Sequence, residues 1–182
     1  MFLHIPKTAG TSIERVFGGC RAKHKTIRKM YRGLSQDQID RYFKFTFIRN
    51  PYDRIVSLYN YLKAEVDLFP DFTEWVENTV CSTMSEIRNM NNARRHFASY
   101  HEWLVDDSTM STFFIGRFEN LQEDFDIICD RINHSRVILP HELKSTKKAH
   151  YSEYYTTRTI DLITEKYQKD LDIFKYTYST DI

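Results

Sequence analysis

A short segment near the start of the sequence, HIPKTAGTS, constrains the fold more than any other feature. Apolar residues predict a buried strand over residues 2–5. The helical spacing of Ile13, Val16 and Phe17 predicts a helix over residues 11–17. A strand, a tight turn and a helix N-terminus in this order present backbone N–H groups to an anion. The segment therefore predicts an anion-binding turn at the end of a strand.

The rest of the chain alternates between patterns typical of strands and patterns typical of helices. Aromatic and β-branched residues predict further strands over residues 43–48, 112–115 and 137–139. Apolar stripes predict helices that start near Pro51 and Leu121, and a last helix over residues 157–167. This alternation predicts an α/β fold with a parallel sheet.

Three other segments carry weaker local signals. Residues 21–32 are basic and are expected to form a loop, whereas residues 71–107 are expected to be helical but irregular. Ser35 and Gln38 have the spacing of a capping box and predict a short helix.

Length and composition favour one globular domain over residues 1–182. The chain is 41% apolar, and its 13 Phe, 12 Tyr and 2 Trp supply bulky core residues. The 26 basic and 25 acidic side chains nearly cancel, so no nucleic-acid partner is expected. The three cysteines lack a metal-binding spacing, and no apolar run reaches the roughly 18 residues of a membrane helix.

The position of the lysine in the first turn indicates what kind of anion it holds. In a nucleoside-triphosphatase loop the lysine follows the last glycine, but here Thr11 follows Gly10 and Lys7 precedes it. Gly10 would let the backbone approach the ligand, and the N–H and hydroxyl groups of Thr11 and Ser12 would hold its terminal group. Because no acidic residue after a strand suggests a Mg²⁺ site, a sulfuryl group fits this turn. The alternative is an ordinary helix start with a solvated lysine.

A second motif, RNPYDRIVSLY, follows the predicted strand over residues 43–48. Arg49 and Ser57 are eight residues apart, which is compatible with convergence on one group at the carboxyl edge of the sheet. An arginine fork with a hydroxyl suits a phosphate monoester, such as an extra phosphate on a ribose. The alternatives are an ion pair of Arg49 with Asp53 and a surface hydroxyl at Ser57.

Together, HIPKTAGTS and FIRNPYDRIVSLY resemble the paired donor-binding signature of sulfotransferases that use 3′-phosphoadenosine 5′-phosphosulfate (PAPS). The resemblance is closest to the carbohydrate group that includes heparan sulfate 2-O-sulfotransferase and its small bacterial relatives. The stretches GRFENLQEDF and KYQKDLDIFKY also resemble the family. The resemblance implies a P-loop-kinase-like, three-layer α/β fold in which helices flank a central parallel sheet.

The resemblance also implies roles for residues at matching positions. Arg49 and Ser57 would bind the 3′-phosphate of the donor. A loop between Pro140 and Tyr151 would close over the donor, although a solvated basic loop is an equal alternative. The residues implied for the 5′-phosphosulfate are Lys7, Thr8, Ala9, Gly10, Thr11 and Ser12, and those implied in the closing loop are Ser145, Lys147 and Lys148.

Sulfuryl transfer also needs a general base, for which the sequence offers several candidates. His24 is the first choice because it lies between the donor motifs, where the heparan sulfate relative keeps its basic histidines, and Lys23 and Lys25 would favour its neutral form. Each candidate has a packing, ion-pairing or solvated role as its alternative. The other candidates are His96, His101 and Glu14, and His4 is expected to pack beside the first strand and support the turn.

The resulting expectation is a sulfotransferase that moves a sulfuryl group from PAPS to a hydroxyl, with a carbohydrate as the expected acceptor and without a metal. The alternatives are an ATP-dependent small-molecule kinase, which would need Mg²⁺, and a noncatalytic nucleotide-binding module. Golgi relatives carry a membrane anchor, and this sequence has no apolar run long enough for one. We therefore expect a cytoplasmic bacterial or viral protein, or a Golgi-lumen protein if the chain is trimmed.

Overall fold

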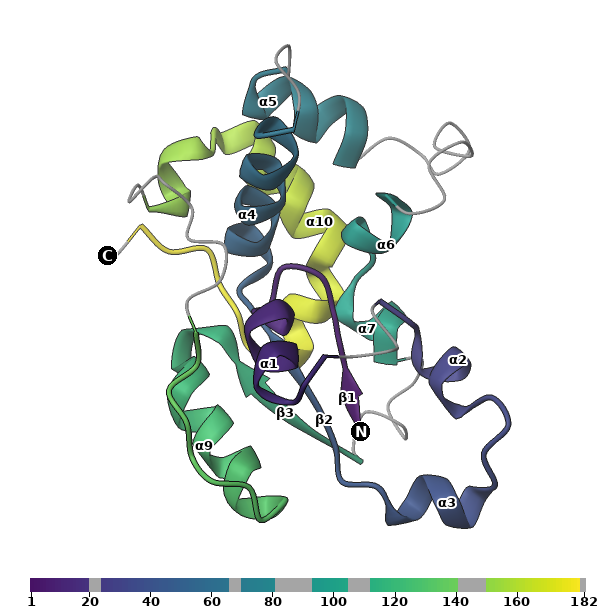
Figure 1. Cartoon of the computed structure of the whole chain (residues 1–182). Helices are drawn as coiled ribbons and strands as arrows, with labels where there is room; N and C mark the ends of the chain where they lie inside the picture. The colour runs from purple at the N-terminus through teal and green to yellow at the C-terminus, as the bar shows by residue number, and fades with distance from the viewer. Residues whose placement is uncertain (20–23, 66–69, 81–92, 105–111, 141–149, 181–182) are drawn as a thin grey trace. The chain divides into compact units, whose positions relative to one another are not determined.

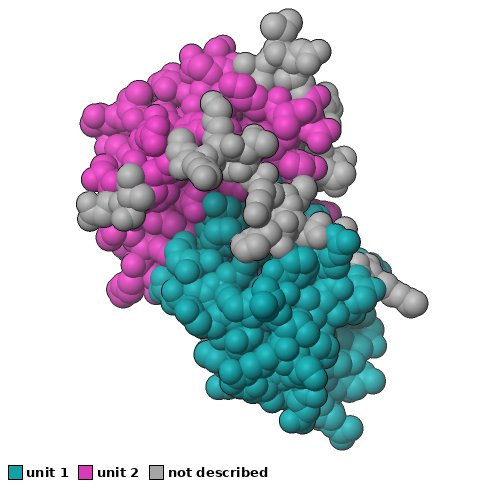
Figure 2. Space-filling model, turned by 60° about the vertical axis from the view of Figure 1, so that its left-hand side comes forward, with its two compact units in different colours: residues 1–49, 100–143 teal, residues 50–99, 144–182 magenta. Residues whose placement is uncertain are grey.

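The computed structural model of the chain describes residues 1–19, 24–65, 70–80, 93–104, 112–140 and 150–180 (Figure 1). The chain forms two compact units, residues 1–49 with 100–143 and residues 50–99 with 144–182, which Figure 2 shows in different colours. The first unit contains the sheet and the second unit is helical in its described part.

Strands β1 (Phe2–Leu3), β2 (Lys44–Ile48) and β3 (Phe113–Arg117) form one parallel sheet in the order β1-β2-β3. In its register, Leu3 lies opposite Thr46, and Ile48 lies opposite Arg117. The predicted α/β class is therefore confirmed: helices flank three parallel strands in one sheet. Because the strands are parallel, the segments that follow them meet at the same edge of the sheet.

Aromatic residues of β2 form the core of the first unit. Every residue of β2 is buried, as expected for the central strand of a parallel sheet. Phe45 and Phe47 pack in one cluster with Ile13 of α1 (Gly10–Val16) and Phe125 of α9 (Leu121–Arg131). Burial of these side chains fixes α1 and α9 against the sheet, and α9 runs beside β3 in Figure 1.

The first unit confirms most of the local predictions. The strands predicted over residues 43–48 and 112–115 are present as β2 and β3. Ser35 and Gln38 form the predicted capping box at the start of α3 (Gln36–Arg41). The expected basic loop over residues 21–32 needs correction, because its described part contains a short helix, α2 (Ile27–Tyr31).

The strand predicted over residues 137–139 is wrong. This segment has no regular secondary structure, and the side chain of Gln122 on α9 takes hydrogen bonds that a neighbouring strand would take. The amide nitrogen of Gln122 donates to the carbonyl of Val137 at 3.1 Å, and the N–H of Leu139 donates to the amide oxygen of Gln122 at 2.9 Å. A side chain therefore satisfies the backbone of this segment without placing it in the sheet.

The second unit is built from helices around an aromatic core. Tyr52 packs against Tyr155, and Tyr59 packs against Trp75. The last helix extends beyond the predicted residues 157–167, because its apolar stripe continues past a non-helical residue, Tyr167. Its described helices are α4 (Pro51–Lys63), α5 (Phe72–Trp75), the π-helix Val76–Val80, α6 (Ala93–Phe97), the 3₁₀ helix Tyr151–Tyr154 and α10 (Thr157–Phe174).

Two further short helices, α7 (Tyr100–Leu104) and the 3₁₀ helix Phe118–Asn120, belong to the first unit. Together with α5, α6 and the π-helix, α7 confirms that the described part of residues 71–107 is helical but irregular. None of the described helices is long and apolar enough to cross a bilayer.

Close packing in the sheet makes a prediction about Gly116. Gly116→Ala should lower the free energy of unfolding by about 1–3 kcal/mol, as overpacked cores do. A Cβ there would lie 2.5 Å from a ring carbon of the fully buried Phe47. Denaturant titration measures this change. The same substitution should cost less in a Phe47→Leu background, which leaves room for the methyl group; equal costs would contradict the steric explanation.

Candidate functional site

The turn after β1 has an uncommon backbone conformation. Lys7 and Ala9 have φ angles of 68° and 64°, which are in the left-handed region although both residues carry side chains. Left-handed residues beside a helix N-terminus can turn successive N–H groups toward one anion. Inside the turn, the buried hydroxyl of Thr8 donates to the carbonyl of Ile5 at 2.9 Å, which stabilises this conformation.

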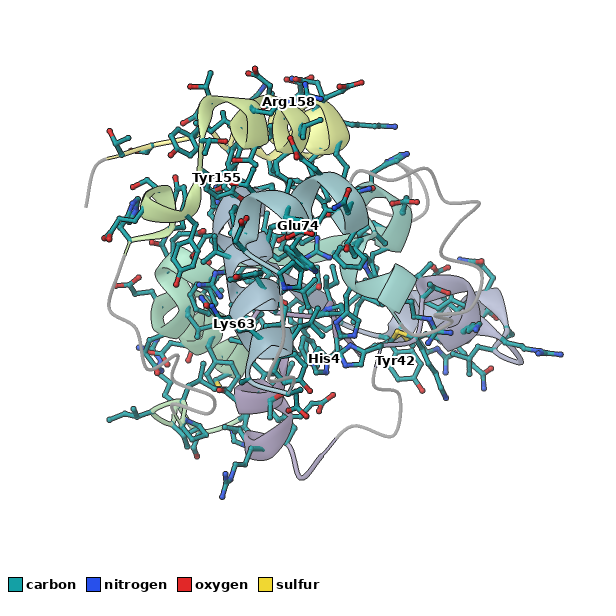
Figure 3. The ribbon with its side chains drawn as sticks, turned by 90° about the horizontal axis from the view of Figure 1, so that it is seen from above. His4, Tyr42, Lys63, Glu74, Tyr155 and Arg158 are labelled. Carbon is teal, nitrogen blue, oxygen red and sulfur yellow. The ribbon has the colours of Figure 1, made fainter. Side chains whose placement is uncertain are left out.

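The space beside Gly10 is filled by the imidazole of His4. A Cβ on Gly10 would lie 2.0 Å from Cδ2 and 2.1 Å from Nε2 of His4, so only glycine admits this ring. On the other side of the ring, Nδ1 lies 2.6 Å from Oε1 of Glu14, and both side chains are at least 95% buried. His4, which Figure 3 labels, thus packs where we expected it and links the end of β1 to α1.

His24 lies next to this pair. The centroid of its ring is 4.5 Å from that of His4, at an angle of 47° between the rings. A left-handed φ angle of 53° at His24 turns the chain at this point. Contacts through one side chain, His4, therefore connect the first-choice base to Gly10 of the turn.

Arg49 follows β2 directly and belongs to the same unit as the turn. Its guanidinium carbon lies 4.0 Å from the centroid of the Phe118 ring. Burial and the neighbouring charge of Arg49 lower the pKa of Lys7 from 10.5 to about 8. The structure therefore brings two predicted donor-binding cations, Lys7 and Arg49, close enough to repel each other.

The other predicted site residues lie elsewhere or outside the described residues. In the first unit Thr11 is half-buried, Ser12 is buried, and His101 lies on α7. In the second unit Ser57 lies half-buried on α4, and the carbonyl of His96 on α6 accepts a hydrogen bond from Arg54. The residues predicted in the closing loop, Ser145, Lys147 and Lys148, are outside the described residues.

The sequence did not predict two side chains that contact Arg49, and it predicted a different role for a third side chain, that of Glu14. Tyr100 and Phe118 contact Arg49, and Glu14 binds His4 rather than standing alone as a candidate base. Phe118 lies within the GRFENLQEDF stretch, which was a usable signal, whereas nothing local in the sequence points from Tyr100 to Arg49. Within the described residues, no group of three or more His, Cys, Asp or Glu is placed to hold a metal ion.

The parallel sheet places two cations, Lys7 and Arg49, after neighbouring strands, an arrangement suited to an anionic ligand. The model of the sulfotransferase family matches residues 1–177, so the chain belongs to the sulfotransferase family. The sulfotransferase part of the prediction is confirmed, and with it an enzyme that transfers a sulfuryl group to a hydroxyl-bearing acceptor, whereas the heparan sulfate 2-O-sulfotransferase-like group stays a prediction. The searches of curated proteins and of solved structures returned no match.

The lowered pKa of Lys7 makes stability depend on pH. Between about pH 8 and pH 10.5 the unfolded chain holds a proton on Lys7 that the folded chain has lost, so the free energy of unfolding rises with pH. Lys7→Met removes this effect: the variant should exceed the wild type in stability at pH 7, and its advantage should shrink above pH 8. Denaturant titrations of the ligand-free protein from pH 7 to pH 10 measure the difference.

An Arg49→Met background provides the control. With one of its two causes removed, the pKa of Lys7 should rise, so the advantage of Lys7→Met should be smaller at pH 7 and should begin to shrink only at a higher pH. A difference between Lys7→Met and wild type that stays constant from pH 7 to pH 10 would contradict the lowered pKa.

Proposed function

We propose that this sulfotransferase uses PAPS as its donor and transfers the sulfuryl group to a hydroxyl of a carbohydrate without a metal. The observation that carries the proposal is the pair of cations, Lys7 and Arg49, at the ends of neighbouring parallel strands. An adenosine ligand with one anionic group at its 5′ end and another on its ribose would need two such positive sites. The carbohydrate acceptor rests on the resemblance of the two motifs to the heparan sulfate 2-O-sulfotransferase group.

In the proposed reaction, the acceptor oxygen forms a bond to sulfur while the bond from sulfur to the 5′-phosphate oxygen breaks. The acceptor proton passes to a general base, and 3′-phosphoadenosine 5′-phosphate (PAP) leaves. The ammonium of Lys7 would stabilise the negative charge that develops on the bridging oxygen, and its burial strengthens this interaction. Arg49 and Ser57 would hold the 3′-phosphate and so fix the donor.

The turn residues contribute to the proposed donor site in different ways. The hydroxyl of Thr8 is already used inside the turn, and Ala9 and Gly10 have no polar side chain, so these residues would act through their backbone N–H groups. Thr11 and Ser12 would add hydroxyls at the start of α1. Ser145, Lys147 and Lys148 are proposed as further donor contacts on the resemblance alone.

His24 is the proposed general base. Its packing against His4, which in turn fills the space beside Gly10, supports a position near the turn. Glu14 is a weaker candidate because one of its carboxylate oxygens is engaged with His4 at 2.6 Å. His96 and His101 stay as alternatives.

The donor assignment is tested by ligand-induced stabilisation. We expect PAP to stabilise the protein against heat more than ADP does, with or without Mg²⁺, since only PAP carries a 3′-phosphate. At 100 times its dissociation constant, PAP should add about 2.7 kcal/mol to the free energy of unfolding. Arg49→Ala should remove most of the preference for PAP. Equal stabilisation of the wild type by PAP and ADP would refute the 3′-phosphate site.

The base assignment is tested by separating donor binding from turnover. His24→Ala should bind PAP like the wild type but lose turnover by about 10²–10⁴-fold, the usual contribution of a general base. His134→Ala is the control, because His134 is an exposed histidine of the same unit, with Nδ1 at 2.7 Å from the carbonyl of Ser135 and its ring edge-to-face with Phe17. Near-normal turnover of His24→Ala would move the base to His96, His101 or Glu14.

A further inference from the structure

The backbone of Arg49 is held by a hydroxyl from a distant part of the chain. The N–H of Arg49 donates to Oη of Tyr100 at 3.0 Å, and the same Oη donates to the carbonyl of Arg49 at 2.7 Å. In a regular sheet, backbone groups of a neighbouring strand would form hydrogen bonds with these two groups. Here β2 ends at Ile48, and the fully buried Tyr100 extends its hydrogen bonding by one residue.

The side chain of Arg49 contacts the aromatic ring of Phe118, the residue that follows β3. Its guanidinium carbon lies 4.0 Å from the centroid of Phe118, well within the range of a cation–π contact. Phe118 directly follows β3, and the register that pairs Ile48 with Arg117 brings Arg49 and Phe118 to neighbouring positions. A guanidinium that stacks on an aromatic ring uses its face for that contact, whereas the N–H groups that bind phosphate lie in its plane.

From these contacts we infer that Tyr100 and Phe118 are positioning residues that orient Arg49 and so determine the preference for a nucleotide with a 3′-phosphate. The inference rests on the proposed function, since it gives Arg49 the 3′-phosphate as its ligand. A long arginine side chain loses rotamer freedom when it binds, and an arginine that is already ordered loses less. The effect of both residues should therefore fall on recognition of the 3′-phosphate and not on the rest of the nucleotide.

The test compares two nucleotides that differ only in the 3′-phosphate, PAP and adenosine 5′-monophosphate (AMP). Calorimetry of the full chain gives the ratio of their affinities without turnover. Tyr100→Phe and Phe118→Leu should each lower the PAP-to-AMP ratio by about tenfold, which corresponds to about 1.4 kcal/mol. In an Arg49→Ala background, neither substitution should change the ratio further, because the residue through which both act is gone.

Tyr155→Phe is the matched control. It also deletes a tyrosine hydroxyl that donates to a backbone carbonyl, that of Tyr52 at 2.9 Å, but in the second unit (Tyr155 is labelled in Figure 3). It should lower thermal stability without lowering the ratio. Phe118→Leu, at a half-buried position, keeps the test decisive if Tyr100→Phe does not fold.

The outcomes separate this inference from the proposed function. If the wild type prefers PAP, Arg49→Ala abolishes that preference and the two positioning variants retain it, the role of Tyr100 and Phe118 is refuted while the donor site stands. If the wild type binds PAP and AMP equally, the donor site itself is refuted. A lowered ratio in both variants, with no change in Tyr155→Phe, supports the inference.

Discussion

Parallel pairing of β2 with both of its neighbours is the constraint on which the candidate site depends. It brings together three segments that are far apart in the sequence: the turn that contains Lys7, Arg49 after β2, and Phe118 after β3. In an antiparallel arrangement, the middle of these segments would lie at the opposite edge of the sheet. The direction and register of the strands thus decide which side chains lie near one another at this edge of the sheet.

This arrangement carries an electrostatic cost when the ligand is absent. Burial of Lys7 disfavours its charged form, and Arg49 disfavours it further, so the free protein holds two like charges in an unfavourable setting. The anionic groups of the proposed donor, one beside Lys7 and one beside Arg49, would offset both effects. Within the fold, burial of the cluster that joins β2, α1 and α9 offsets this cost.

Local patterns predicted the elements well, and they predicted their contacts poorly. The capping box at Ser35 and the helix start at Pro51 depend on neighbouring residues and were evident in the sequence. The segment over residues 137–139 has strand-like composition, but its hydrogen bonds go to Gln122, which composition cannot reveal. Likewise, Gly10 was expected to admit a ligand, and only the folded turn shows that it admits the ring of His4.

The left-handed conformation of Lys7 supports a functional role for this side chain. Glycine adopts such a φ angle without the cost of about 1–2 kcal/mol that a side chain brings, so a turn selected for stability alone would have glycine at this position. Glycine would remove the ammonium that the proposed anion site requires. Ala9 has the same conformation but no chemical group, and its side chain has no such explanation. Two residues of this turn therefore depart from the preference for glycine at a left-handed φ angle, and the proposed role of the ammonium explains the departure at Lys7.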